Sequence, residues 1–76
     1  MTKHKQIIDM INAKSHASVL QSEYIAETDC SLFTISVNNV VHDLEVYYYT
    51  DGRYSYYVDN HIMHVTRNVN DLTNWF

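Results

Sequence analysis

The residue types that could hold a metal ion come together once in this chain of 76 residues, where His61 and His64 stand three positions apart and Asp59 lies close by. Successive side chains of a β-strand point to opposite faces, so two residues three apart on a strand do not readily reach the same ion. Structural zinc sites also use four Cys or His ligands at recognisable spacing, and Cys30 is the single cysteine. The sequence therefore predicts no metal site and no bound cofactor.

The sequence does not indicate a catalytic nucleophile or a phosphate-binding loop either. No flanking signature accompanies Cys30, which we expect to be a small buried residue rather than a nucleophile. Gly52 is the only glycine, so the chain has no glycine-rich loop to bind phosphates. A domain of this size also offers little depth for a substrate cleft. We expect a protein that binds a partner, and not an enzyme.

The formal charge narrows the class of partner. Nine Asp and Glu residues against five Lys and Arg give a net charge of −4 at pH 7. Nucleic-acid binders usually cluster Lys and Arg to neutralise phosphates, whereas here Arg53 and Arg67 stand alone and the lysines lie near the N-terminus. Direct nucleic-acid binding is therefore disfavoured. An acidic domain suits a basic protein surface, because opposite electrostatic potentials speed the encounter.

The expected setting is the cytoplasm. A single cysteine excludes an internal disulfide framework and fits a reducing compartment. The apolar runs are also too short for a signal peptide, and a membrane span needs about 20 apolar residues. We expect no membrane association.

The length predicts one α+β domain covering residues 1–76. Ile7, Ile8 and Ile11 form an apolar stripe at helical spacing. This stripe indicates an N-terminal helix over residues 3–13. Residues 14–28 fit continued helical spacing, although several serines weaken the pattern. We favour helix there, broken near Ser15, over a first strand.

The rest of the chain predicts an antiparallel β-meander of three to four strands over residues 31–66, followed by a short C-terminal helix over residues 69–76. The strands are separated by short turn signals. Asn38-Asn39 suits a two-residue hairpin loop, because Asn tolerates positive φ. Asp51-Gly52 is the strongest turn signal, and Asp59-Asn60 marks a third turn, with Asn60-His61 as the alternative.

These turns predict which side chains share a face, because directly opposed residues of an antiparallel pair lie on the same side of the sheet. The first hairpin gives an apolar face that the N-terminal helix covers, with Phe33, Ile35, Leu44 and Val46. A two-residue loop at Asp51-Gly52 opposes Tyr49 to Tyr54 and Tyr47 to Tyr56 on the other face. That tyrosine face stays partly open unless Trp75 and Phe76 cover it.

The predicted binding site is the tyrosine face with its acidic border. Tyrosine suits interfaces because it combines rigid contact area with a polar tip. The predicted site residues are Tyr47, Tyr49, Tyr54, Tyr56, Asp43, Glu45, Asp51, Asp59 and Met63. The alternatives are that the tyrosine pairs only stabilise the hairpin, or that the face forms a homodimer. Stacking of single-stranded bases is a third alternative, although the bordering carboxylates would repel phosphates.

The order of helix, antiparallel meander and short terminal helix on a small acidic chain resembles phage-encoded inhibitors of the anti-CRISPR and anti-defence type. The segments that carry the resemblance are Ile7-Ile8-Asp9-Met10-Ile11, Leu32-Phe33-Thr34-Ile35-Ser36-Val37-Asn38-Asn39 and Asn70-Asp71-Leu72-Thr73-Asn74-Trp75-Phe76. The likeness is one of architecture, so no functional residue is carried over. It implies a stoichiometric inhibitor in the host cytoplasm that binds a host protein or ribonucleoprotein complex through a basic surface, by DNA mimicry or by steric blocking.

Overall fold

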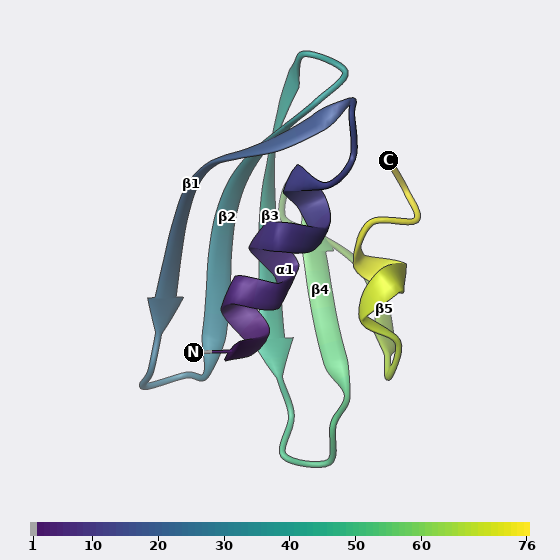
Figure 1. Cartoon of the computed structure of the whole chain (residues 1–76). Coiled ribbons are helices and arrows are strands. Elements are labelled where there is room, and N and C mark those ends of the chain that lie inside the picture. Colours follow the sequence, from purple (N-terminus) through teal and green to yellow (C-terminus); the bar gives the residue numbers. More distant parts are fainter. Residues whose placement is uncertain (1) are drawn as a thin grey trace.

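The computed structural model describes residues 2–76, apart from the side chains of Thr2 and Met63. One α-helix is followed by five strands and a 3-10 helix: α1 (Thr2–Asn12), β1 (Ala17–Ile25), β2 (Cys30–Val37), β3 (Val40–Tyr48), β4 (Tyr54–Val58), β5 (His61–Thr66) and η1 (Val69–Leu72). The strands form one antiparallel sheet in the order β1-β2-β3-β4-β5, and α1 and η1 lie on the same face of it (Figure 1). The predicted α+β class with an antiparallel sheet is confirmed. No helix within residues 2–76 is long and apolar enough to cross a membrane.

The core lies between α1 and the sheet face that it covers, which we call the inner face. Ile7 and Ile11, one helical turn apart, are fully buried there. Lys5 and Asp9 lie on the solvent side of the helix and form an ion pair between positions i and i+4, with 2.8 Å between the charged atoms. The predicted amphipathic stripe therefore positions α1 across the apolar centre of the sheet, which consists of Phe33, Ile35, Leu44 and Val46.

The prediction of helix for residues 14–28 is wrong, because β1 is a strand. Serine has modest helix propensity and β-branched Val19 favours a strand. The end of α1 also directs the chain into the sheet, since the side-chain Oδ1 of Asn12 accepts a hydrogen bond from the N–H of Val19 (2.9 Å). The register with β2 shifts between Val19 and Gln21, so β1 carries a bulge at Leu20. The sheet therefore has five strands instead of three to four.

The predicted C-terminal helix is only a four-residue 3-10 helix. Asn68 caps it, because its side chain accepts a hydrogen bond from the N–H of Asn70 (3.1 Å). Leu72 from this turn is fully buried in the core. Trp75 and Phe76 also pack against the core, and the ring of Trp75 contacts that of His42 with 5.4 Å between centroids. These two aromatic residues therefore lie on the inner side and leave the opposite face uncovered.

The loop between β3 and β4 is one residue longer than predicted. The N–H of Tyr49 donates to the carbonyl of Arg53 (2.9 Å) and the N–H of Gly52 donates to that of Tyr49 (3.1 Å), so Thr50, Asp51 and Gly52 form a three-residue loop. Gly52 has φ +89°, as the last residue of such a loop requires. The turns at Asn38-Asn39 and Asp59-Asn60 are confirmed as two-residue loops with positive φ at both positions.

This extra residue reverses the predicted faces of β4. Val46 opposes Tyr56 and Tyr48 opposes Tyr54, and a register shift of one residue moves a whole set of side chains to the other side of a sheet. Tyr54 and Tyr56 are consequently buried on the inner face, with 8% and 6% of their surfaces exposed. The predicted face of four tyrosines is therefore wrong, and Val58 likewise lies in the core.

We expect Gly52→Ala to lower the free energy of unfolding by about 1–2 kcal/mol. The added Cβ would meet no atom within 4 Å, so the loss would come from backbone strain at φ +89°. Thr50→Ala in the same loop is the control and should change stability by no more than about 0.5 kcal/mol. Urea unfolding measures both variants. Equal stability of the two would contradict the loop geometry.

Tyr56→Ala should cost about 3–5 kcal/mol, because it empties a buried aromatic site. Tyr49→Ala, at a position with 41% of its surface exposed, should cost less than about 1 kcal/mol. Chemical denaturation of the two variants tests the register directly. The two-residue loop predicted from the sequence would require losses of similar size, and that result would overturn the observed register.

Candidate protein-binding surface

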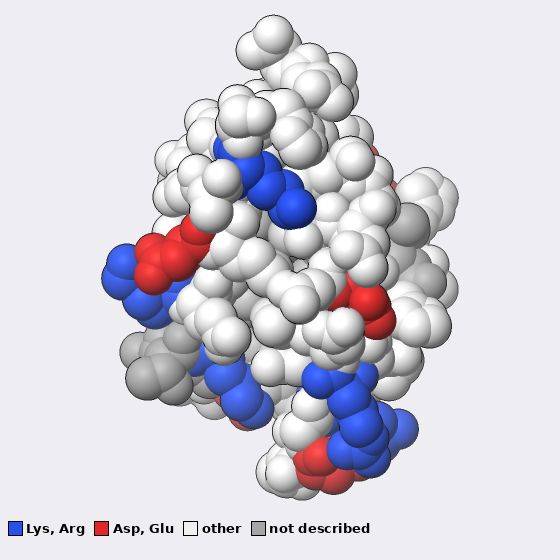
Figure 2. Space-filling model, turned by 45° about the vertical axis from the view of Figure 1, so that its right-hand side comes forward, with Lys and Arg blue, Asp and Glu red and all other residues white. Residues whose placement is uncertain are grey.

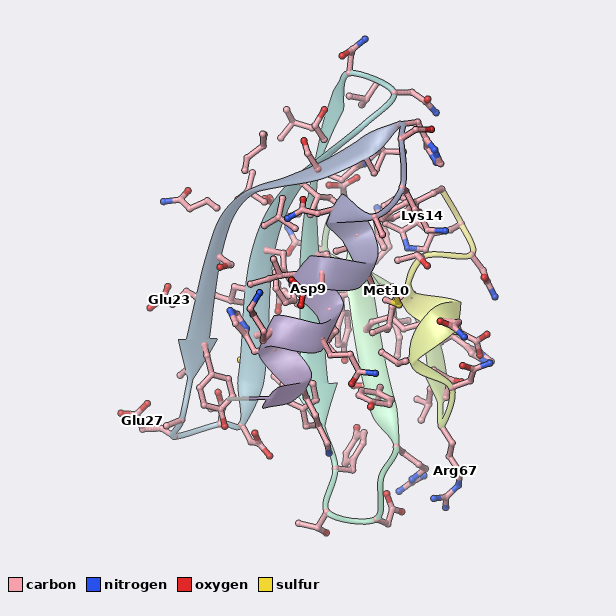
Figure 3. All side chains as sticks on the ribbon, in the orientation of Figure 1. Asp9, Met10, Lys14, Glu23, Glu27 and Arg67 are labelled. Atoms are coloured by element: carbon pink, nitrogen blue, oxygen red, sulfur yellow. The ribbon has the colours of Figure 1, made fainter. Side chains whose placement is uncertain are left out.

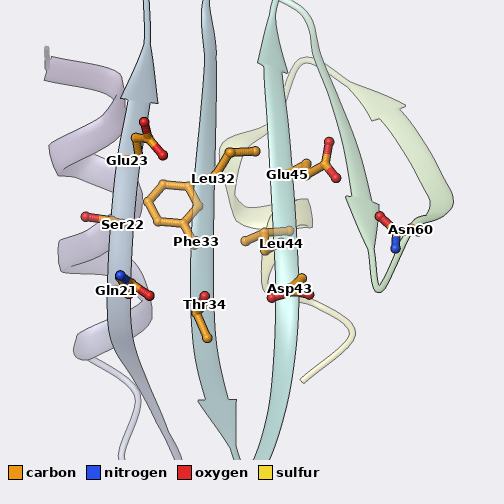
Figure 4. A pocket seen from close by; sticks show the side chains of 10 residues that line it. All are labelled: Gln21, Ser22, Glu23, Leu32, Phe33, Thr34, Asp43, Leu44, Glu45 and Asn60. Carbon is orange, nitrogen blue, oxygen red and sulfur yellow. The ribbon is translucent and has the colours of Figure 1, made fainter.

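The sheet face opposite α1, which we call the outer face, is covered by none of the elements that the structure describes. Figure 4 views this face, with α1 behind the sheet. Several of its apolar side chains are largely exposed, including Val41, Ile62 and Val65 at 60%, 63% and 41%. A small domain that leaves such residues in water has a surface suited to a partner.

A central row of five side chains crosses the outer face from one edge of the sheet to the other. The register opposes Glu23 to Leu32, Leu32 to Glu45, Glu45 to Tyr57, and Tyr57 to Ile62. Neighbouring strands lie about 4.8 Å apart, so the backbones of Glu23 and Glu45 are separated by about 10 Å with Leu32 between them. The row therefore offers two carboxylates around an apolar side chain, followed by an aromatic ring and an aliphatic end.

The part of the outer face over β1, β2 and β3 is hollowed. The hollow has a volume of about 560 Å³ and is open to solvent. Leu32 lies between Glu23 and Glu45 in this region (Figure 4), and Thr34 and Asp43 extend the lining along β2 and β3. This arrangement can accept a protruding element whose apolar side chain contacts Leu32 while its cations reach the carboxylates.

Tyrosines fix the middle of the central row. The hydroxyl of Tyr47 donates to Oε2 of Glu45 (3.1 Å), and this hydrogen bond, with partial burial, raises the pKa of Tyr47 above its ordinary value. The ring of Tyr47 meets that of Tyr57 edge to face, with centroids 5.7 Å apart. Glu45 is therefore held in position by a neighbour that stays protonated and donates to it.

The carboxylates of the outer face lack cationic neighbours. The sequence has no Lys or Arg between Lys14 and Arg53, and within residues 2–76 the ion pairs to Lys or Arg involve Asp9 and Asp51 only. Figure 2 shows Lys and Arg spread over the α1 side of the molecule, some of them beside Asp or Glu. In Figure 3, Glu23 projects from the β1 edge of the sheet. The outer face is thus anionic.

Asp59 has a structural role at the border of this face. Its carboxylate accepts hydrogen bonds from Nδ1 of His42 (2.7 Å) and from the N–H of Asp43 (2.9 Å). The bond from His42, followed by the one from Asp43, lowers the pKa of the Asp59 carboxyl below its usual value. The turn between β4 and β5 is thereby attached to β3.

The structure brings together only part of the predicted site. Asp43, Glu45 and Tyr47 lie on the outer face as expected. Tyr49 directly precedes the β3–β4 loop. Its hydroxyl donates to Oγ of Ser55 on the outer face (3.4 Å), and its ring lies 5.1 Å from the guanidinium of Arg53, which pairs with Asp51. Tyr54 and Tyr56 are in the core, Asp59 bonds His42, and the side chain of Met63 lies outside the described residues.

Four members of the central row were not predicted as site residues: Glu23, Leu32, Tyr57 and Ile62. Glu23 was missed because β1 was assigned as helix. Tyr57 was missed because the two-residue loop placed it on the inner face. Reading residues 17–25 as a strand and Gly52 as the end of a three-residue loop would have identified both.

A histidine and a serine meet in the core in a way that resembles a base and a nucleophile. Nδ1 of His4 lies 2.7 Å from Oγ of Ser31, which in turn lies 2.6 Å from the hydroxyl of Tyr48. Ser31 has no exposed surface, so a substrate cannot reach it in this structure. Burial raises the pKa of Tyr48 to about 12, and the three groups form a neutral polar link between α1 and the sheet.

Metal-binding residues do not gather in the described part of the chain, where no three His, Cys, Asp or Glu side chains could hold one ion. His61 opposes Val58 and His64 opposes Tyr56 across the β4–β5 pair. Cys30 is buried, and its Sγ accepts a hydrogen bond from the Thr28 hydroxyl (3.2 Å).

Asp59→Asn should make stability less dependent on pH. A lowered folded-state pKa means that the carboxylate stabilises the fold above its unfolded-state pKa of about 3.9, and that this contribution is lost as the pH falls through the folded-state value. The variant suits the positive φ of position 59 and should be less stable at pH 6 by up to about 1 kcal/mol. Urea titrations from pH 6 down to pH 2.5 should show this difference shrink progressively below about pH 4; a constant difference would contradict the lowered pKa of the Asp59 carboxyl.

No protein-family model, no curated protein and no solved structure matches this chain, so its outer face is interpreted from its own residues.

Proposed function

We propose that this chain is a protein-binding module that docks its outer face onto a basic surface of another protein. The observation that carries the proposal is the central row, in which Glu23 and Glu45 flank Leu32 on a sheet whose five strands contain no Lys or Arg. Apolar contact at Leu32 and Tyr57 would supply binding energy, and the carboxylates would select a cationic partner.

Within this class, we propose a stoichiometric inhibitor of a host defence complex that handles nucleic acid, of the CRISPR or restriction type. Proteins that bind nucleic acid do so through clustered Lys and Arg that neutralise phosphates. An anionic module seated on such a cluster excludes the nucleic acid from it. The charge of −4 and the position of Glu23, Asp43 and Glu45 on one open face support this proposal.

The same features weigh against the alternatives. A homodimer formed face to face would bring the carboxylates of two copies together, and like charges at an interface are unfavourable. Single-stranded nucleic acid could stack on Tyr47 and Tyr57, but Glu45 lies directly beside both rings and repels phosphates. The proposed partner is therefore a cationic protein surface.

The double change Glu23→Gln/Glu45→Gln tests this function. Losing two charge-assisted contacts should weaken partner capture at least about tenfold, which corresponds to about 1.4 kcal/mol, while the melting temperature stays within a few degrees of wild type. The measurement is affinity purification from the native host with mass spectrometry, followed by titration of the purified partner. The captured protein should also lose binding to nucleic acid when the wild-type chain is added.

Asp9→Asn/Glu27→Gln is the matched control, because it removes the same number of charges from α1 and from the β1–β2 turn. This variant should capture the partner as well as the wild type does. Equal capture by both double variants would contradict docking through the outer face. A partner that still binds nucleic acid in the complex would contradict the inhibitory role alone.

A further inference from the structure

The spacing of the central row restricts the shape of the partner element, if the proposed function holds. The five side chains lie on successive strands, at about 4.8 Å intervals. A partner segment that runs along the row must therefore present one side chain about every 5 Å on a single side.

An α-helix meets this requirement. Residues at i, i+3 or i+4, i+7, i+10 or i+11, and i+14 lie on one helix face. With a rise of 1.5 Å per residue, they recur on average about every 5.3 Å. Over the four intervals of the row, the accumulated mismatch is about 2 Å, which side-chain rotamers can absorb.

Other backbone conformations fit less well. An extended strand presents same-side residues about 6.7 Å apart. When its first residue lies on Glu23, the second falls about 3 Å short of Glu45 and the third passes it by about 4 Å. A polyproline II segment has three residues per turn and a 3.1 Å rise. It would present a same-side residue only about every 9.3 Å, reaching Glu23 and Glu45 but leaving Leu32 without a contact.

The shape of the face agrees with a rod-like element. The hollow on the outer face crosses β1, β2 and β3 over the acidic half of the row. Its lining includes Glu23, Leu32 and Glu45 and also the neighbouring row of Gln21, Thr34 and Asp43. Beyond the hollow, the row continues with the half-buried ring of Tyr57 and with Ile62, of which 63% is exposed. Its acidic part is therefore concave and its far end is apolar.

We infer that the partner of the outer face is an amphipathic helix that lies across the strands, with Lys or Arg at i and i+7. The cations pair with Glu23 and Glu45, and an apolar residue at i+3 or i+4 contacts Leu32. Further apolar residues at i+10 or i+11 and at i+14 pack on Tyr57 and Ile62. The same pattern read in the opposite chain direction is equivalent.

Lactam-stapled helical peptides test this inference, with helicity verified by circular dichroism. One peptide carries lysines at i and i+7 and leucines at i+4, i+11 and i+14, and a second has the reversed sequence. The control peptide has the same composition and staple, but its lysines stand at i+2 and i+9, on the other side of the helix. Fluorescence anisotropy measures the binding of each labelled peptide to the wild-type chain, to Glu23→Gln/Glu45→Gln and to Asp9→Asn/Glu27→Gln.

The peptide with lysines at i and i+7 and the peptide with the reversed sequence are the two stripe peptides. One of them should bind the wild-type chain at least tenfold more tightly than the control peptide. Glu23→Gln/Glu45→Gln should abolish this preference, and Asp9→Asn/Glu27→Gln should retain it. Equal binding of stripe and control peptides, or binding of none, would overturn the helical partner. The stripe and control peptides could also bind the wild-type chain equally and both fail to bind Glu23→Gln/Glu45→Gln. That result would support the anionic docking face and reject only the helical partner. The proposed function itself fails on the separate capture experiment with the two double variants.

Discussion

The positive φ of Gly52 is the constraint on which both faces of the sheet depend. It ends the three-residue loop Thr50-Asp51-Gly52 and thereby sets the register of β4 against β3. With that register, Tyr54 and Tyr56 complete the core beneath α1 and η1. A loop one residue shorter would expose both rings on the outer face and leave the core without them. The backbone conformation at Gly52 consequently determines both which residues form the core and which residues form the candidate site.

Burial on the inner face explains how so small a domain can leave its outer face open. Ile7, Ile11 and Leu72, which have no exposed surface, cover the sheet from one side only. The link from His4 through Ser31 to Tyr48 adds hydrogen bonds inside this layer, where a low dielectric strengthens them. Stability is thus concentrated in one layer, and the side chains of the other face are available for binding.

Much of the fold could be predicted because several local signals agree with the tertiary structure. Asn38-Asn39 and Asp59-Asn60 adopt the positive φ that their composition predicts, and the alternation of apolar residues around Phe33 and Leu44 is that of the inner face. Asp51-Gly52 was ambiguous, because the dipeptide is compatible with loops of two or three residues. Only the packing of β4 against the core distinguishes the two loop lengths.

The candidate site was harder to predict than the fold, since it depends on strands whose alternation is interrupted. The bulge at Leu20 breaks the period of two in β1, so Ala17, Leu20 and Tyr24 mimic helical spacing. The sequence therefore does not predict that Glu23 lies on a strand of the sheet. Asp43, Glu45 and Tyr47 could be predicted because β3 is regular throughout, and its register with β2 follows from a two-residue turn.

The two bulges, at Leu20 in β1 and between Ile62 and His64 in β5, lie on the outermost strands of the sheet. Edge strands of open sheets are templates for amyloid-like stacking, and β1 has neither the lysine nor the proline that often prevents it. A bulge bends the strand and interrupts its row of free amides and carbonyls. The irregularity that obscures β1 in the sequence thus also makes this edge of the sheet a poorer template for the addition of another strand.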